Sequence, residues 1–313
     1  MEPDAVGTIL RKVRETWSLS NNVEITLEAN PTSVEAGRFA GYKDSGVNRV
    51  SIGVQALNDK DLQKLGRLHS VSDAISAIET AANLFDRISF DLIYARQDQT
   101  LDEWRRELEE ALMIAVDHLS LYQLTIENGT SFGDRLAAGG LHGLPQEDLA
   151  ADMYDLTQEL TSKAGLHAYE VSNHAKFGSE SQHNLIYWQG GDYAGIGPGA
   201  HGRLTLNGTR FATESLTSPQ RWLDSVLSAG SGEISLLPQS ASEHADEFMM
   251  MGLRVSEGID MGRYKNISKK ELNTNVINML ERYQLVQVQH GRLKATSRGR
   301  PILNSIIREL LVG

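Results

Sequence analysis

The first half of the sequence repeats one layout four times, and this repeat limits the possible folds more than any other feature. In each repeat a short apolar run is followed by an amphipathic, helix-forming segment. The predicted strands are residues 23–31, 48–55, 87–94 and 117–124. The predicted helices after them lie near residues 33–44, 58–84 (two helices), 100–114 and 146–164. Strands that alternate with helices predict an α/β fold with a parallel sheet.

Apolar and polar side chains alternate within these strands, and successive side chains of a strand point to opposite faces. One face is apolar and contains Ile25, Val50, Ile52, Ile88, Phe90, Leu119 and Leu121. The other is small or polar and contains Thr26, Glu28, Ser51, Gly53, Gln55, Ser89, Asp91, Ser120 and Tyr122. Leu124 is an exception to this alternation in the fourth strand. A sheet with one polar face fits an open, partial barrel with a partly polar lumen better than a sealed core.

The start of the chain does not match a complete barrel. Residues 3–17 predict a helix, with Pro3 in its first turn, whereas a parallel barrel begins with a strand. Only four strands are visible in the first half. We therefore expect the first strands of the barrel to be missing from this sequence.

Polar side chains stand near the C-terminal ends of three predicted strands, at Glu28, Gln55 and Asp91. In (β/α) barrels this rim carries the active site. Arg67 follows the second strand; alone it is a helix C-terminal cation, but beside Glu28 and Asp91 it could hold a carboxylate through two hydrogen bonds. Three such positions on one face favour a site over ordinary loop starts.

The second half is organised differently. Residues 166–172 predict a strand, residues 178–208 are glycine-rich and irregular, and helices are expected at 219–229 and 240–255. The tail has a helix at 269–283, two short strands around His290-Gly291 and a helix at 300–311, which resembles a winged-helix module. Such modules bind nucleic acid or serve as structural lids. The net charge of −11 favours the second role and argues against a nucleic-acid partner.

Composition excludes several kinds of site. The chain has no cysteine, which excludes disulfides, thiol nucleophiles and thiolate-bound clusters in these residues. No apolar run is long enough to span a membrane, and residues 1–20 are too polar for a secretory signal. We therefore expect a cytoplasmic protein that is not an integral membrane protein.

Three further motifs favour ordinary structural interpretations. Gly197-Pro-Gly-Ala-His-Gly202 has the spacing of a dinucleotide loop, but Pro198 lacks the N–H that a phosphate needs, so a turn is favoured. His167, Glu170, His174 and His183 have no metal-ligand spacing, so no metal site is predicted there. Met249, Met250 and Met251 are typical of core packing.

Eight segments together resemble the radical-SAM, oxygen-independent coproporphyrinogen-III-oxidase-like family. They are EITLEANP, NRVSIGVQALNDKDLQKLGRLHS, SFDLIY, HLSLYQLTIENGT, ADMYDLTQEL, YEVSNHAKFG, HNLIYW and GDYAGIGPGAHGR. The HNxxYW motif is typical of the heme-chaperone branch of that family. The resemblance extends over nearly the whole chain.

The resemblance implies a partial (β/α)6 barrel with an α+β C-terminal extension. In the family, three cysteines after the first strand hold a 4Fe-4S cluster, and a glycine-rich turn after the second strand receives S-adenosylmethionine (SAM). Neither element is present in this sequence. We expect three parts: a truncated radical-SAM partial barrel at 1–165, a glycine-rich, heme-associated segment at 166–240 and a winged-helix-like module at 241–313.

The resemblance also assigns site residues. Glu28, Gln55, Arg67 and Asp91 match family positions that contact SAM. The residues that match the heme-associated motif are His183, Asn184, Tyr187 and Trp188. A histidine can ligate heme iron, aromatic rings can lie on the macrocycle, and glycines allow the backbone to approach a flat ligand. Without the resemblance, a buried histidine packed by aromatic rings would be the favoured interpretation.

The sequence departs from the family at two places. The family turn Gly-Leu-Pro-Gly-Gln is replaced after Tyr94 by Ala95-Arg96-Gln97-Asp98-Gln99, on the rim where SAM is expected. Gln182 replaces a usual cation before His183, which weakens any contact with a heme propionate.

Three functions remain open at this point. The first is a radical-SAM heme chaperone that, at full length, binds heme, SAM and a 4Fe-4S cluster and passes heme to an acceptor such as a membrane-associated respiratory protein. The second is an enzyme, an oxygen-independent coproporphyrinogen-III oxidase of porphyrin biosynthesis. The third is a heme-binding remnant without a cluster. The HNLIYW segment favours the first, and the lack of cysteine means that this chain cannot itself ligate the cluster.

Overall fold

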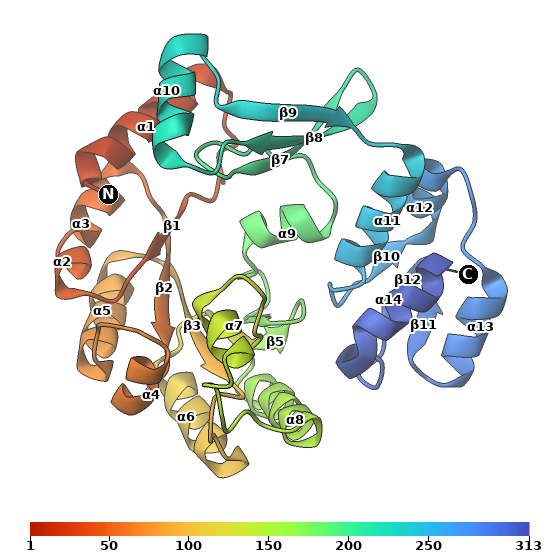
Figure 1. Ribbon diagram of the computed structural model, residues 1–313, viewed down its shortest axis with the longest axis horizontal. Helices are drawn as coiled ribbons and strands as arrows, with labels where there is room; N and C mark the ends of the chain where they lie inside the picture. The colour runs from red at the N-terminus through yellow and green to blue at the C-terminus, as the bar shows by residue number, and fades with distance from the viewer. Residues whose placement is uncertain (313) are drawn as a thin grey trace. The chain divides into compact units, whose positions relative to one another are not determined.

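The computed structural model describes residues 1–312, which form two compact units, Met1–Glu180 and Ser181–Gly313. Each unit has its own hydrophobic core. Figure 1 shows both units and labels most of their helices and strands. The predicted division at residues 165 and 240 stays a prediction.

The first unit contains a six-stranded sheet and eight helices among the described residues. Its strands are β1 (Thr26–Ala29), β2 (Arg49–Gln55), β3 (Arg87–Tyr94), β4 (His118–Gln123), β5 (His167–Ala168) and β6 (Asn173–Ala175). Its helices are α1 (Pro3–Thr16), α2 (Ser33–Ala36), α3 (Phe39–Ser45), α4 (Asp59–Lys64), α5 (Val71–Leu84), α6 (Leu101–Ile114), α7 (Ser131–Ala137) and α8 (Glu147–Lys163).

The sheet has the strand order β1-β2-β3-β4-β6-β5. The first four strands are parallel, as their alternation with helices predicts, and β6 and β5 add two antiparallel pairs. Of the predicted strand at 166–172, only His167–Ala168 is a strand (β5), and β6 begins one residue after the predicted range. The result is the expected α/β partial barrel, an open sheet that does not close on itself.

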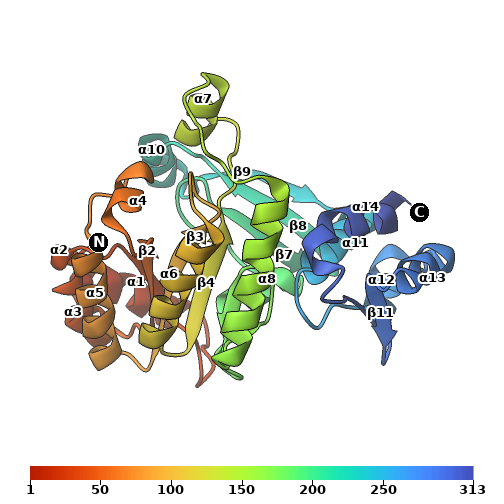
Figure 2. The ribbon, with the colours of Figure 1, turned by 90° about the horizontal axis from the view of Figure 1, so that it is seen from below.

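The apolar face of the sheet forms the core of the first unit. Val50, Ile52, Phe90 and Leu119 are almost fully buried, as their alternation predicts. Figure 2 shows α5, α6 and α8 covering the sheet on one side. Trp104 of α6 is also buried there, and its indole N–H donates to Thr157 Oγ1 of α8 at 2.9 Å. Helix caps fix where α5 and α6 begin, since Ser70 and Thr100 each form a capping box.

The second unit contains two antiparallel sheets of three strands each. Its strands are β7 (His201–Leu206), β8 (Thr209–Ser215), β9 (Glu233–Pro238), β10 (Ile259–Asp260), β11 (Val286–Gln289) and β12 (Arg292–Ala295). Its helices are α9 (Gln182–Trp188), α10 (Pro219–Ala229), α11 (Ala241–Gly252), α12 (Met261–Ser268), α13 (Thr274–Arg282), the 3₁₀ turn η1 (Arg300–Ile302) and α14 (Leu303–Val312).

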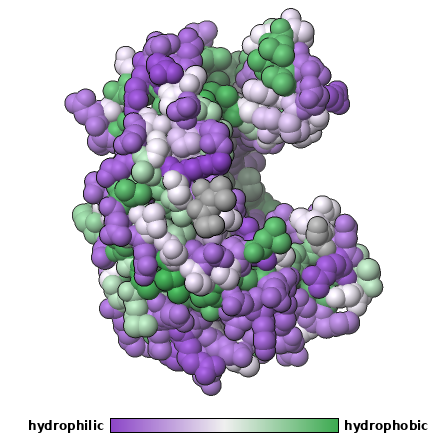
Figure 3. All heavy atoms as spheres, turned by 90° about the vertical axis from the view of Figure 1, so that its left-hand side faces the viewer, coloured by the Kyte–Doolittle hydropathy of each residue, from purple (hydrophilic) through white to green (hydrophobic). Residues whose placement is uncertain are grey.

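The winged-helix-like tail is confirmed, with the hairpin β11–β12 between α13 and α14 and a third strand, β10, on β12. The core packing expected of the three methionines is confirmed for Met249 and wrong for Met250, which is exposed, while Met251 is partly buried. Three further predictions were wrong: the helix near 33–44 is two helices, α2 and α3, residues 178–208 contain a helix and a strand, and the helix predicted at 269–283 begins at Thr274 after a separate helix, α12. The face of the molecule in Figure 3 is mostly hydrophilic, with apolar side chains in scattered groups.

The turn after β3 keeps a backbone that favours glycine, although it has none. Ala95 and Asp98 have positive φ angles of 57° and 58°. These are the two positions at which the resembling family has glycine. The turn is also held by buried charge, because Arg96 donates to Glu107 Oε2 at 2.6 Å and to Asp61 Oδ2 at 2.9 Å. The change of sequence has therefore added local strain and kept the turn.

We predict that Ala95→Gly costs less stability than a matched substitution in a helix. Both Ala95 and Ala111 of α6 are buried, so each change to glycine removes one buried methyl group and adds the same freedom to the unfolded chain. Only at Ala95 does glycine also relieve left-handed strain, which is worth about 1–2 kcal/mol. Urea denaturation should therefore give a free energy of unfolding for Ala95→Gly that is about 1–2 kcal/mol above that of Ala111→Gly. Equal losses would show that Ala95 carries no strain.

Candidate functional site

A polar cavity of about 360 Å³ opens at the C-terminal ends of the parallel strands. Each of the strands β1 to β4 contributes to its wall. The lining residues are Glu28, Ala29, Asn30, Ser51, Gly53, Gln55, Arg67, Asp91, Ser120 and Tyr122. The structure therefore brings together Glu28, Gln55, Arg67 and Asp91, the four residues that the sequence predicts as one site.

Asp91 is the most perturbed acid of this cavity. Burial raises its pKa from 3.8 to about 6, and the Gln55 hydrogen bond and the charge of Arg67 oppose this shift only in part. The amide Nε2 of Gln55 donates to Asp91 Oδ2. Gln55 itself has a φ of 75°, a conformation that is costly for a residue with a side chain. Strain and a shifted pKa at the same place are typical of functional sites.

The charges of the cavity are unevenly divided. Glu28 and Asp91 supply two carboxyl groups, and Arg67 supplies one guanidinium group from the loop between α4 and α5. The cavity can therefore accept hydrogen bonds from hydroxyl or ammonium groups, and it can hold one carboxylate through Arg67. This set of groups suits a ligand with a net positive charge, hydroxyls and one carboxylate.

Besides Ala29 and Gly53, sequence reasoning did not assign four polar residues of the cavity wall: Asn30, Ser51, Ser120 and Tyr122. Three of them were on the predicted polar face, so their alternation was a usable signal. Asn30 follows β1, and only its closeness to Glu28 pointed to it. Burial and the nearby charge of Asp91 raise the pKa of Tyr122, so its phenol stays protonated near neutral pH.

The four residues predicted to contact heme lie on α9, a helix of seven residues with no fully buried side chain. His183 and Tyr187 are four residues apart on one face, and their ring centroids are 4.8 Å apart. Tyr193 extends this group, 4.3 Å from Tyr187 and with its ring edge-on. Burial and then Tyr193 raise the pKa of Tyr187, which keeps that phenol neutral. His183 is exposed beside these rings.

Asn184 and Trp188 occupy a different face of α9. Each follows a residue of the His183–Tyr187 pair by one position, which corresponds to about 100° around a helix. Trp188 lines a cavity of about 330 Å³ together with Phe248, Ile259, Arg263 and Arg292, all of the second unit. The motif therefore divides into one face with the exposed imidazole of His183 and the half-buried phenol of Tyr187, and a Trp188 face that borders this cavity.

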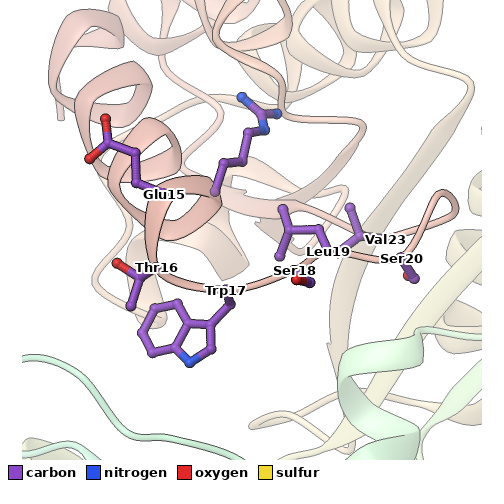
Figure 4. A pocket seen from close by; sticks show the side chains of 8 residues that line it. Glu15, Thr16, Trp17, Ser18, Leu19, Ser20 and Val23 are labelled. Carbon is purple, nitrogen blue, oxygen red and sulfur yellow. The ribbon is translucent and has the colours of Figure 1, made fainter.

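A further cavity, of about 420 Å³, lies at the end of α1 and is lined by Arg14, Trp17 and other residues between 14 and 23 (Figure 4). Its walls contain no predicted site residue. The side chains in Figure 4 come from a single continuous segment, so they do not converge from several elements as those at the strand ends do.

Two sequence-level interpretations can be compared with the structure. Gly197 and Gly199 have φ angles of 119° and 69° and precede a strand, β7, which confirms a turn in place of a dinucleotide loop. Within residues 1–312 the structure has no group of three His, Cys, Asp or Glu side chains arranged to hold a metal ion. None of the helices described is both long and apolar enough to cross a membrane.

The comparisons with known proteins identify the family. Residues 2–111 match the radical SAM superfamily, and residues 239–302 match the HemN C-terminal domain. The bovine mitochondrial radical S-adenosyl methionine domain-containing protein 1 is 37% identical over 320 residues, which cover 99% of this chain and 72% of that protein. The heme chaperone HemW of Escherichia coli K12 is 34% identical over 312 residues, 98% of this chain and 80% of HemW.

The fold is similar to that of a solved structure. Coproporphyrinogen III oxidase (HemN) from Escherichia coli superposes with a TM-score of 0.80 over 99% of this chain and 74% of HemN, at 16% identity. The similarity to HemN shows the fold alone. The sequence relatives show to which branch of the family the chain belongs. With both, the chain belongs to the HemW-type branch of the radical SAM family.

Proposed function

We propose that this protein is a heme chaperone that carries heme on α9 and binds SAM in the cavity at the strand ends. The observation that carries the proposal is the convergence of Glu28, Gln55, Arg67 and Asp91 on one cavity, in a chain 34% identical to a protein named heme chaperone HemW. Coproporphyrinogen oxidation, the alternative, rests on similarity of fold.

The cavity fits SAM by charge and by hydrogen bonding. SAM carries a sulfonium, an ammonium and a carboxylate group, so its net charge is positive. Arg67 would hold the carboxylate, and Glu28 and Asp91 would accept hydrogen bonds from the ribose hydroxyls or the ammonium group. Gly53 also lines the cavity, and any side chain there would take up part of the space.

A 4Fe-4S cluster does not fit these residues. Such clusters are held by cysteine thiolates, and the sequence has no cysteine. When bound in the radical SAM family, the cluster supplies the electron that cleaves SAM. The residues of this chain would bind and orient SAM.

Heme is the cargo in this proposal. The imidazole of His183 is exposed and could ligate the iron, while Tyr187 and Tyr193 offer aromatic surface beside it. Asn184 and Trp188 complete the proposed heme-associated set from the neighbouring face of α9. The acceptor would be a heme-requiring protein, such as a membrane-associated respiratory protein, and transfer would take place in the cytoplasm without a nucleic-acid partner.

We predict that His183→Ala weakens heme binding at least tenfold. The substitution would remove the imidazole proposed to bind the heme iron, and a tenfold change in Kd corresponds to about 1.4 kcal/mol. Titration of hemin into the whole chain, followed by the Soret band, measures this. His142→Ala is the matched control, since His142 is an exposed histidine of the first unit. If the wild type binds heme and His183→Ala binds it equally well, the assignment of His183 as the iron ligand is wrong.

We predict opposite effects of Asp91→Asn on stability and on SAM binding. The neutral carboxyl is favoured in the folded protein, so this group lowers stability as the pH rises from about 4 to about 6, and the loss persists above that range. Asparagine keeps an oxygen for Gln55 Nε2 and carries no charge. The difference between 3.8 and about 6 corresponds to a gain of up to about 3 kcal/mol at pH 7.

The same substitution removes an anionic acceptor from the cavity, so SAM should bind about tenfold more weakly or worse. Thermal unfolding across pH 4–8 and calorimetric titration with SAM test the two effects together. Asp73→Asn is the control, with the opposite expected effect on stability. Hydrogen bonds from Ser70 lower the pKa of Asp73, so removing this carboxylate should reduce the free energy of unfolding at pH 7. A destabilised Asp91→Asn protein at pH 7 would refute the assignment of a costly charge.

A further inference from the structure

A chain of hydrogen bonds runs through the polar face of the sheet and ends at the cavity. It begins at Arg49 of β2, whose exposed fraction is 4%. Arg49 Nη2 donates to Ser89 Oγ at 2.9 Å, and Nη1 lies 3.5 Å from Thr26 Oγ1. A guanidinium group can only donate hydrogen bonds, so the direction of the chain is fixed at its first link.

Ser89 accepts a hydrogen bond from Arg49 and donates one to Ser51. Its exposed fraction is 1%, and its hydroxyl donates to Ser51 Oγ at 3.0 Å. If Ser51 donated to Ser89 instead, the Ser89 proton would be buried without an acceptor among the hydrogen bonds of residues 1–312. Burying an unpaired donor is costly, so the direction from Ser89 to Ser51 is the one that satisfies both hydroxyls.

Among residues 1–312, no hydrogen bond donated by the Ser51 hydroxyl is found, although Glu28 is its neighbour across the β1–β2 pair. Ser51 is only partly buried and lines the cavity that also contains Glu28, Gln55 and Asp91. We propose that the Ser51 hydroxyl donates a hydrogen bond to an acceptor atom of the adenosine half of SAM, and that Ser89 and Arg49 are positioning residues for this donor. This inference rests on the proposed binding of SAM in the cavity.

The choice of the adenosine half follows from the other groups of the cavity. The two carboxyl groups serve as acceptors, and Arg67 is suited to the methionyl carboxylate. The ring nitrogens of adenine and the ribose ring oxygen are acceptors, and these acids cannot pair with them. Ser51 supplies a neutral donor for these atoms from β2, in the same wall as the phenol of Tyr122 and the amide of Asn30.

A second serine of the same cavity offers a comparison. Ser120 of β4 also lines the cavity, but its hydroxyl donates to Asn173 Oδ1 at 2.6 Å. The amide of Asn173 is oriented in turn, since its Nδ2 donates to Glu170 Oε1 at 2.6 Å. The proton of Ser120 is therefore used within the protein, whereas that of Ser51 is available to a ligand.

The test is calorimetric titration of the whole chain with SAM, adenosine and L-methionine in turn. Ser51→Ala should weaken SAM and adenosine by about five- to tenfold, the effect of one lost hydrogen bond, and leave methionine unchanged. Ser89 would not contact the ligand itself, so Ser89→Ala should weaken the binding of SAM and of adenosine by only about two- to fourfold. Ser120→Ala should change them less than Ser51→Ala, and Ser51→Thr, which keeps the hydroxyl, should restore affinity for adenosine.

The outcomes separate this inference from the proposed function. A wild-type chain that binds neither SAM nor adenosine would overturn both the SAM site and the role of Ser51. If the wild type binds SAM and Ser51→Ala binds it equally well, or if methionine is weakened as much as adenosine, only the role of Ser51 fails. Thermal unfolding of each variant shows whether any loss of affinity reflects a loss of fold.

Discussion

Arg49 carries a buried positive charge at the start of β2, on the polar face of the sheet, and the hydrogen bonds of that face begin at it. Burial lowers the pKa of this guanidinium, while Glu24 is the largest of the charges that oppose the shift. Its hydrogen bonds to Ser89 and Thr26 offset part of the cost of burial. Near it, burial and the charge of Arg49 hold the pKa of His118 well below its usual range, so His118 stays neutral and contacts Tyr169 Oη at 3.0 Å. A sheet with such a face is stable only when these groups satisfy one another.

Two energetically unfavourable features lie at the C-terminal ends of β2 and β3: a strained backbone and a buried acid. Gln55 and Ala95, at or just after the ends of β2 and β3, have positive φ angles of 75° and 57°. Asp91 lies between the two in the sequence and is held in a setting that opposes its charge. Such costs persist where the surrounding structure determines the conformation, and here the buried ion pairs of Arg96 with Glu107 and Asp61 hold the turn. The rim is therefore preorganised at the expense of stability, which is consistent with a binding site.

The sequence predicts the parallel strands because each one alternates clearly between apolar and polar residues. Val50 and Ile52 on one face, and Ser51 on the other, leave little choice of register. The sheet β7–β8–β9 is not predictable in this way. Arg210 of β8 is buried and ion-paired with Asp192, and the apolar side chains of β9, Ile234, Leu236 and Leu237, are exposed. Their pattern does not separate an inner from an outer face, so tertiary contacts decide the structure.

Prediction from sequence succeeds for part of the candidate site and fails for the rest. Glu28, Gln55 and Asp91 were predictable because strand ends converge in a barrel, and Arg67 because a family motif marks it. The two faces of α9 were not, because a segment rich in glycine does not predict a helix. The different directions of Tyr187 and Trp188 follow from helical geometry only once that helix is known.

A seven-residue helix is too short to be stable alone, so the orientation of His183 depends on what holds α9. The C-terminal module supplies this support. Arg263 of α12 donates to the carbonyl oxygens of Gln189 at 2.6 Å and Gly190 at 2.9 Å, where α9 ends. Its guanidinium lies 4.6 Å from the Phe248 ring centroid, and Gly190 has a φ of 63° and no room for a side chain without displacing Phe248. A cation at the C-terminal end of a helix stabilises it. The HemN-type module therefore holds α9 from the Trp188 side, and the imidazole of His183 stays exposed beside the half-buried ring of Tyr187.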